Sequence, residues 1–218
     1  MDWQELINKR HTTFAWDDSK VPSRSVIEEV FEEAYLHVPT KNLMYPYEAI
    51  AYRNDDDEIR KEIMTICHRN KDMPVETDRG NPQVLAPWLI GFTGRYTQDL
   101  EKRYERSSYR ERPIQRDSEQ MEIGMCAMFF AYAFASRGIQ TGYCQNILNN
   151  PLRGGEIFGL EPGRKLRFIM GVGYGKDSAT RHEYYDPRVN QNKSIPYTPD
   201  HVGVIYPRPD IEKVFRVL

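Results

Sequence analysis

The sequence predicts an α+β fold, a three-layer α/β/α sandwich with a mixed, mainly antiparallel sheet. Its helical and strand-like segments follow the order helix, helix, strand, helix, strand, loop, helix, strand, strand, and an extended tail. This order is too irregular for a doubly wound parallel sheet, and no Gly-x-Gly-x-x-Gly follows any of the strands. Helices on both faces of one sheet are therefore the better match.

Capping residues and apolar periodicity place the elements of the first third of the chain. These elements are a helix from the Asp2 cap to about Arg10, a helix opened by Pro22-Ser23 and ended near Val38-Pro39, a strand at Tyr47–Arg53, and a helix capped by Asp55–Asp57 that runs from Glu58 to about His68.

Two buried strands and a long apolar helix are predicted in the rest. The segments are a polar loop at 71–83, a strand at Val84–Thr93, a helix from Ser118 closed by Arg137-Gly138, a strand at Ile139–Cys144, turn-rich sequence to Gly163, and a strand at Arg164–Tyr174. The helix is apolar nearly all round, so we expect it in a core or a subunit interface. Its methionines, Met121, Met125 and Met128, are interpreted as core packing.

The chain is predicted to be one domain, residues 1–218. Within it, residues 94–117 form a lid-like excursion, and residues 177–218 form an extended tail that wraps around a partner subunit. Arg and Tyr interleave in residues 101–116, as in proteins that bind single-stranded nucleic acid, but acidic residues offset much of the charge. We therefore favour the lid and keep a nucleic-acid-associated module as a remote third reading.

Composition excludes several classes of protein. A net charge of −2 and a pI near 6.2 argue against nucleic acid or an anionic membrane as partner. No signal peptide and no membrane-spanning run is visible. Three widely spaced cysteines predict neither a disulfide framework nor a metal site. We expect a cytoplasmic protein.

The most informative stretch closes the first helix: Lys9-Arg10-His11-Thr12-Thr13. A guanidinium can grip phosphate oxygens as a bidentate fork, and hydroxyls and backbone N–H groups can add short hydrogen bonds. The alternative is simple complementation of the negative end of the helix dipole by exposed cations.

Three further segments follow in a fixed order: Val38-Pro39-Thr40-Lys41-Asn42 after helix two, Asn81-Pro82-Gln83-Val84-Leu85-Ala86-Pro87 before a buried strand, and Gly138-Ile139-Gln140-Thr141-Gly142-Tyr143-Cys144-Gln145-Asn146 after the apolar helix. Together with the N-terminal stretch, the pattern resembles the nitroreductase family of FMN enzymes over roughly residues 2 to 175. The resemblance implies a homodimer with FMN at the subunit interface.

The resemblance also implies roles for individual residues. Arg10 and Thr12, with His11 beside them, would hold the FMN phosphate, and Arg208 is the best candidate to add to that grip. The partner subunit would contribute Pro39, Thr40, Lys41 and Asn42. Asn81 would bind the flavin ring or ribityl chain, and the backbone of Tyr143, Cys144, Gln145 and Asn146 would lie near N5.

Some of these residues also have simpler readings. Asn42 is as easily a helix C-cap as a flavin contact, Asn81-Pro82 is a common turn pair, and Gln145-Asn146 at a strand end is also typical of a turn. Both readings stay open at this point.

Two positions depart from the family pattern. Phe14 stands where the family has Lys or Arg near the flavin ring, a loss we estimate at about 1–2 kcal/mol for the reduced flavin, with Lys41 as a substitute cation. Gln145-Asn146 is bulkier than the residues of relatives and would reshape the substrate pocket.

The resemblance therefore implies an FMN-binding enzyme that uses NAD(P)H, by a ping-pong mechanism, for two-electron reduction of a small acceptor such as a nitroaromatic or a quinone. Flavin N5 would carry the hydride, so no catalytic side chain and no metal is expected. The alternative, motivated by Phe14, is a degenerate dimer that binds FMN or another ligand without turnover.

Overall fold

The computed structural model describes residues 2–10, 12–13, 15–40, 43–67, 81–95, 102, 112–176, 195–196 and 204–205, with backbone alone at 112–117, 195–196 and 204–205. The chain divides into two compact units, Met1–Ala179 and Thr180–Leu218. Each is described by itself.

The first unit is built on a four-stranded sheet in the order β1-β2-β4-β3. The strands are β1 (Tyr47–Arg53), β2 (Trp88–Gly94), β3 (Gln140–Cys144) and β4 (Leu166–Gly173). Every pairing within this sheet is antiparallel. The expectation of a mixed sheet is thus wrong for the described strands, since the parallel contact on this sheet is an isolated bridge between Thr12 and Thr141.

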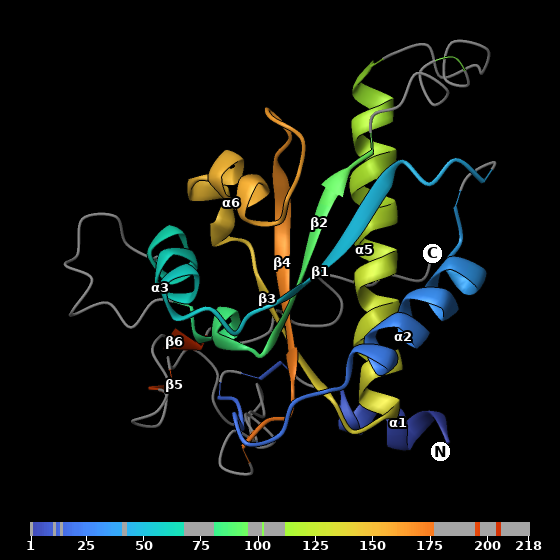
Figure 1. Ribbon diagram of the computed structural model, residues 1–218. Coiled ribbons are helices and arrows are strands. Elements are labelled where there is room, and N and C mark those ends of the chain that lie inside the picture. The colour runs from blue at the N-terminus through green and yellow to red at the C-terminus, as the bar shows by residue number, and fades with distance from the viewer. Residues whose placement is uncertain are drawn as a thin grey trace. The chain divides into compact units, whose positions relative to one another are not determined.

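Helices cover both faces of this sheet, which confirms the predicted α+β layering (Figure 1). The helices α1 (Trp3–Lys9), α2 (Arg24–His37) and α5 (Arg112–Ser136) lie on one side, and α3 (Asp57–Ile66) and α6 (Pro151–Ile157) lie on the other. Two short 3-10 helices, η2 (Pro82–Leu85) and η3 (Asn146–Asn149), connect strands to their neighbours.

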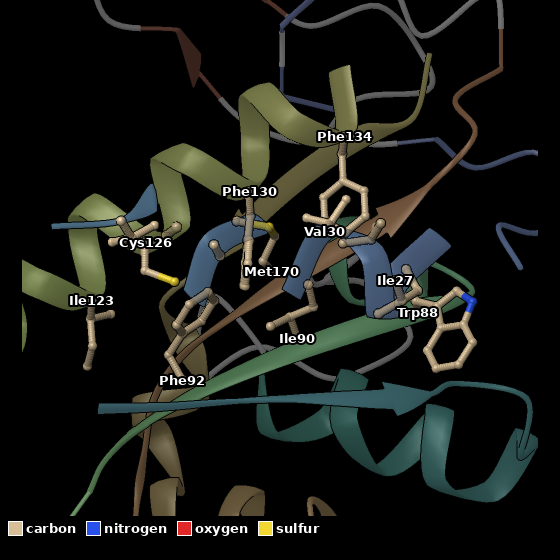
Figure 2. Packing of buried hydrophobic residues seen from close by; sticks show 14 of the residues in the cluster. Ile27, Val30, Trp88, Ile90, Phe92, Ile123, Cys126, Phe130, Phe134 and Met170 are labelled. Atoms are coloured by element: carbon tan, nitrogen blue, oxygen red, sulfur yellow. The ribbon is translucent and has the colours of Figure 1, made fainter. Parts of the chain in front are cut away.

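The strand β2 is buried along its whole length and serves two hydrophobic cores. Because side chains alternate across a strand, Ile90 and Phe92 enter the core beneath α2 and α5, and Leu89 enters the core beneath α3 and α6. Figure 2 shows Phe92, Phe130 and Met170 converging in the first of these cores. Neither face of β2 is exposed to solvent, which explains why the sequence of this strand is almost continuously apolar.

The predicted helix ends are confirmed by capping hydrogen bonds. The Asp2 carboxylate accepts from the Glu5 N–H at 2.7 Å, and the Asp56 carboxylate accepts from the N–H groups of Glu58 and Ile59 at 2.9 and 3.0 Å. At the end of α5, Gly138 has a φ of +71° and donates its N–H to the Ala135 carbonyl at 3.0 Å. This left-handed cap stops the helix where Arg137-Gly138 predicted it.

Two element boundaries differ by several residues from the expectation. The strand predicted from Val84 begins at Trp88 instead, because Pro82 opens a 3-10 turn and the Asn54 amide binds the carbonyls of Val84 and Ala86, both at 2.9 Å. The long helix begins at Arg112, so this part of the supposed lid at 94–117 is helical.

The turn-rich sequence before Gly163 contains a helix that was not predicted, α6. The Asn150 side chain caps it and Pro151 occupies its first turn, a start signal that Gly154 and Gly155 obscured. Gly155 is needed because a Cβ there would meet the Arg164 carbonyl oxygen at 2.5 Å.

The second unit contains an antiparallel pair of very short strands, β5 (Ile195–Pro196) and β6 (Val204–Ile205). Whether residues 177–218 wrap a partner stays a prediction, since most of them lie outside the described residues. In the part of the chain that is described, no helix combines the length and the apolar character needed to cross a membrane.

Candidate functional site

A cavity of about 560 Å³ lies between the end of β3 and the middle of α5. Its remaining walls come from β4 and from the residue before η2. The lining residues are Asn81, Gly124, Ala127, Met128, Tyr143, Cys144, Gln145, Asn146 and Phe168. Five of the residues predicted from the sequence, Asn81 and Tyr143 to Asn146, are thus brought together in one place.

Asn81 combines the two readings that the sequence left open. Its carbonyl oxygen accepts the Val84 N–H at 3.0 Å, as expected for a turn, and its side chain lies against the cavity. The side-chain amide donates to the carbonyl oxygen of Cys67, at the end of α3, at 2.6 Å. This bond fixes the orientation of a buried amide at the cavity wall.

Tyr143 connects the two principal walls of the cavity. Its hydroxyl donates to the Ala127 carbonyl oxygen of α5 at 3.0 Å. Burial raises the pKa of Tyr143 to about 12, although the nearby positive charge of Arg10 acts in the opposite direction. The phenol is therefore neutral at physiological pH. The positive charge of Arg10 lies close enough to act on this wall of the cavity.

Cys144 is a buried wall residue rather than an exposed nucleophile. Its sulfur is hydrogen-bonded with the thiol of Cys67, and this bond together with burial raises the pKa of Cys67 well above its usual range. Cys67 therefore stays protonated, and all three cysteines are free thiols.

The segment after α1 lies along the edge of the sheet beside the cavity. Thr12 forms the bridge with Thr141, and the Thr13 N–H donates to the Thr141 carbonyl oxygen at 3.0 Å. Gly142 permits this approach, because a Cβ at that position would meet the Thr13 carbonyl oxygen at 2.6 Å. Arg10, two residues before Thr12, lies close enough to Tyr143 for its positive charge to act on the phenol. His11 and Phe14 lie outside the described residues.

Trp16 fixes the far end of the same segment. Its indole N–H donates to the Pro82 carbonyl oxygen at 2.9 Å, one residue beyond Asn81. Nearby, Gly171 of β4 lies under η2, where a Cβ would meet the Gln83 carbonyl oxygen at 2.1 Å. The N-terminal segment, η2 and the ends of β3 and β4 are therefore packed backbone against backbone.

Two observations make this edge suited to an anionic ligand. Among the described residues, no carboxylate pairs with the Arg10 guanidinium. The Thr13 hydroxyl is fully buried and has no hydrogen-bond partner in the same part of the chain. A buried polar group without a partner is costly, and a ligand or a bound water removes that cost.

Thr40 has a different environment from the one that the resemblance implied. Its hydroxyl donates to the buried Glu122 carboxylate at 2.6 Å and accepts the Tyr45 N–H at 2.9 Å. Neither Thr40 nor Pro39 lines the cavity of its own chain. Their contact with a flavin in a partner subunit stays a prediction, and Lys41, Asn42 and Arg208 lie outside the described residues.

Sequence reasoning missed the wall that α5 contributes, which consists of Gly124, Ala127 and Met128, and it missed Phe168. The interpretation of the three methionines as core packing is confirmed for Met125, which packs against the core, and is wrong for Met121 and Met128. Met121 and Met128 are 58% and 47% exposed, and Met128 lines the cavity. Met121, Gly124 and Met128 recur at helical spacing, and this spacing is the sequence signal that points to one shared face of the helix.

Comparison with known families identifies the class to which this fold and cavity belong. The model of the nitroreductase family matches residues 7–174, which include the N-terminal segment, the sheet and the cavity. The chain therefore belongs to the nitroreductase family, and the resemblance noted in the sequence is confirmed.

Solved structures share the fold at low sequence identity. A nitroreductase family protein from Streptococcus pneumoniae superposes with a TM-score of 0.64 at 15% identity, covering 100% of both chains. Nitroreductase CinD from Lactococcus lactis, solved with nicotinic acid, gives 0.64 at 16% identity over 86% of this chain and 97% of its own.

A third structure, from Exiguobacterium sibiricum, is of a protein provisionally named a nitroreductase and contains FMN. It gives a TM-score of 0.63 at 16% identity over 87% of this chain and 95% of its own. Comparison with curated protein sequences found no match.

Replacing Thr40 with valine should destabilise the protein by about 1–3 kcal/mol, because the buried Glu122 carboxylate loses a hydrogen-bond donor. Thr40→Ser is the matched control. It keeps the hydroxyl and should cost no more than about 0.8 kcal/mol for the lost methyl group. Urea unfolding measures both, and equal losses for the two variants would show that the hydroxyl is unimportant.

Proposed function

We propose that this protein is an FMN-binding oxidoreductase that uses NAD(P)H for the two-electron reduction of small aromatic acceptors, nitroaromatic or quinone-like. The observation that carries the proposal is the cavity itself. It unites Asn81 with Tyr143 to Asn146, the residues that the family pattern places around the flavin ring, and Arg10 and Thr12 lie on the adjoining edge of the sheet.

The residues of the site suit this cofactor. A volume of about 560 Å³ lies within the range of about 300–1,000 Å³ typical of small-molecule and cofactor sites. Arg10 and the Thr12–Thr13 segment offer a cation, hydroxyls and backbone groups for a phosphate. Tyr143 and Phe168 offer aromatic walls, and Asn81 offers an oriented amide for a polar ring edge.

Bound FMN would supply hydride chemistry, and the protein supplies binding, orientation and electrostatics. NAD(P)H gives two electrons and a proton, and a quinone takes these with one proton from solvent to become the hydroquinone. Tyr143 contributes a neutral phenol to the wall, and Cys144 contributes a buried sulfur. No side-chain acid or base on the wall is required for these steps.

The neighbours support the proposal without proving it. The protein from Exiguobacterium sibiricum was solved with FMN, and CinD from Lactococcus lactis was solved with nicotinic acid, which carries the ring type of the nicotinamide donors. At 16% identity these likenesses establish a common fold.

The colour of the purified protein tests the function. We expect flavin absorbance after loading with FMN, and bleaching of that absorbance when NADPH or NADH is added without oxygen. Yellow protein that does not bleach would favour the alternative, a degenerate FMN-binding dimer. That alternative is suggested by Phe14, which replaces the Lys or Arg of the family pattern. Protein that rejects FMN would overturn the proposal.

Arg10→Ala should weaken FMN binding at least tenfold, about 1.4 kcal/mol, because one charge-assisted contact with the phosphate is lost. Lys9→Ala is the matched control, since it removes the neighbouring positive charge, which lies in an exposed ion pair with Glu5 at 2.9 Å. Fluorescence titration with FMN measures both variants. Equal FMN affinities for the two variants would show that Arg10 does not bind the phosphate.

The proposal includes a homodimer of single-domain chains in the cytoplasm, with residues 177–218 wrapped around the partner subunit. Large apolar side chains are exposed on the helices α1, α2 and α5, namely Trp3, Ile7, Tyr35, Leu36, Met121 and Met128. An exposed set of this kind is typical of a surface that another chain covers. The free thiols agree with a reducing compartment.

Sedimentation velocity should give about twice the 25.6 kDa mass of the chain. Leu36→Glu should shift the protein toward monomer, because it places an unpaired charge in the buried interface. Ser25→Glu, at an exposed position early in the same helix, is the control and should leave the dimer intact. A monomeric wild-type protein would contradict the proposal that two subunits share the FMN site.

A further inference from the structure

Gly124 is an unusual residue in the wall of the cavity. It lies in the interior of α5, a 25-residue helix, and glycine destabilises a helix interior relative to alanine. Its φ is not positive, so the backbone conformation does not call for glycine. A reason for glycine must therefore come from its surroundings.

Packing within the chain does not supply that reason. At Gly142 and Gly171, a Cβ would collide with backbone oxygens at 2.6 and 2.1 Å. At Gly124, a Cβ would meet nothing within 4 Å. The space beside Gly124 is part of the cavity.

The neighbours of Gly124 continue the same wall. Ala127 adds a small side chain whose backbone carbonyl holds the Tyr143 hydroxyl at 3.0 Å. Met128 adds a flexible and polarisable side chain, 47% exposed, that adapts to the shape of a ligand. Across the cavity, the half-buried ring of Phe168 offers an aromatic surface for a planar ligand.

From this we infer that Gly124 is a specificity-determining residue whose missing side chain makes room for quinones with two or more fused rings. The inference rests on the proposed function, since it names the acceptor class of that same site. The acceptor is reduced to its hydroquinone by two electrons and a proton from NAD(P)H and a proton from solvent. A side chain at position 124 would take up the room of the second ring.

The experiment compares a one-ring with a two-ring quinone, 1,4-benzoquinone and 1,4-naphthoquinone, as acceptors for FMN-loaded protein. In Gly124→Leu, the ratio of kcat/KM for naphthoquinone to that for benzoquinone should fall at least tenfold, since even one methylene group in a pocket changes discrimination by about 10–200-fold. Ser136→Leu is the control. It adds the same side chain at the exposed end of α5, about 18 Å along the helix, and should not change the ratio.

Two measurements do not depend on turnover. Gly124→Ala should raise the Tm by about 1–4 °C, because it adds a helix former where nothing blocks a methyl group. A lower Tm, or dissociation of the dimer in this variant, would mean that a close contact requires the glycine, and it would overturn the inference. The FMN dissociation constant of Gly124→Leu should stay within threefold of wild type, and a tenfold loss would assign the space to the cofactor instead.

These outcomes separate the two proposals. Wild-type protein that takes up no FMN refutes the proposed function directly, before any acceptor is compared. Wild-type protein that binds FMN and oxidises NAD(P)H, with a quinone ratio that Gly124→Leu leaves unchanged, supports the proposed function and refutes the role of Gly124.

Discussion

The site depends on backbone packed directly against backbone at the edge of the sheet. Gly142 and Gly171 leave no room for a Cβ, and the chain therefore lies against Thr13 on one side and Gln83 on the other. This packing sets the positions of two segments. One is the end of α1 with Arg10, and the other is η2 with Asn81 directly before it. A side chain at either glycine would push these segments away from β3, and the cavity would lose Asn81 from its wall.

The helix α5 serves two environments at once, which explains its unusual composition. One side supplies Phe130 and Phe134 to the core beneath α2 and α5. The other side exposes methionines and contributes Gly124 to the cavity. A helix in this position is apolar nearly all round, because one face packs in the core and another face lines the cavity.

Local rules account for what the sequence could predict. Asp2, Ser23, Asp56 and Gly138 cap their helices through bonds within a few residues, so their signals are readable without the fold. The hydrogen bond of Thr40 with Glu122 joins residues far apart in the chain, and the exposed side of α5 depends on which face meets the sheet. Resemblance to the family found Asn81 and Tyr143 to Asn146, whereas Phe168 carries no local signal and Gly124 carries only the helical spacing that it shares with Met121 and Met128.

The hydrogen bond from Tyr143 to the Ala127 carbonyl has a consequence for the shape of the cavity. It holds the end of β3 at a constant separation from the middle of α5, like a spacer between two plates. Because the phenol loses its proton only near pH 12, this spacing is the same in acidic and neutral surroundings. The Tyr143 hydroxyl therefore helps to set how thick a ligand in the cavity can be, and the neighbouring side chains set how broad it can be.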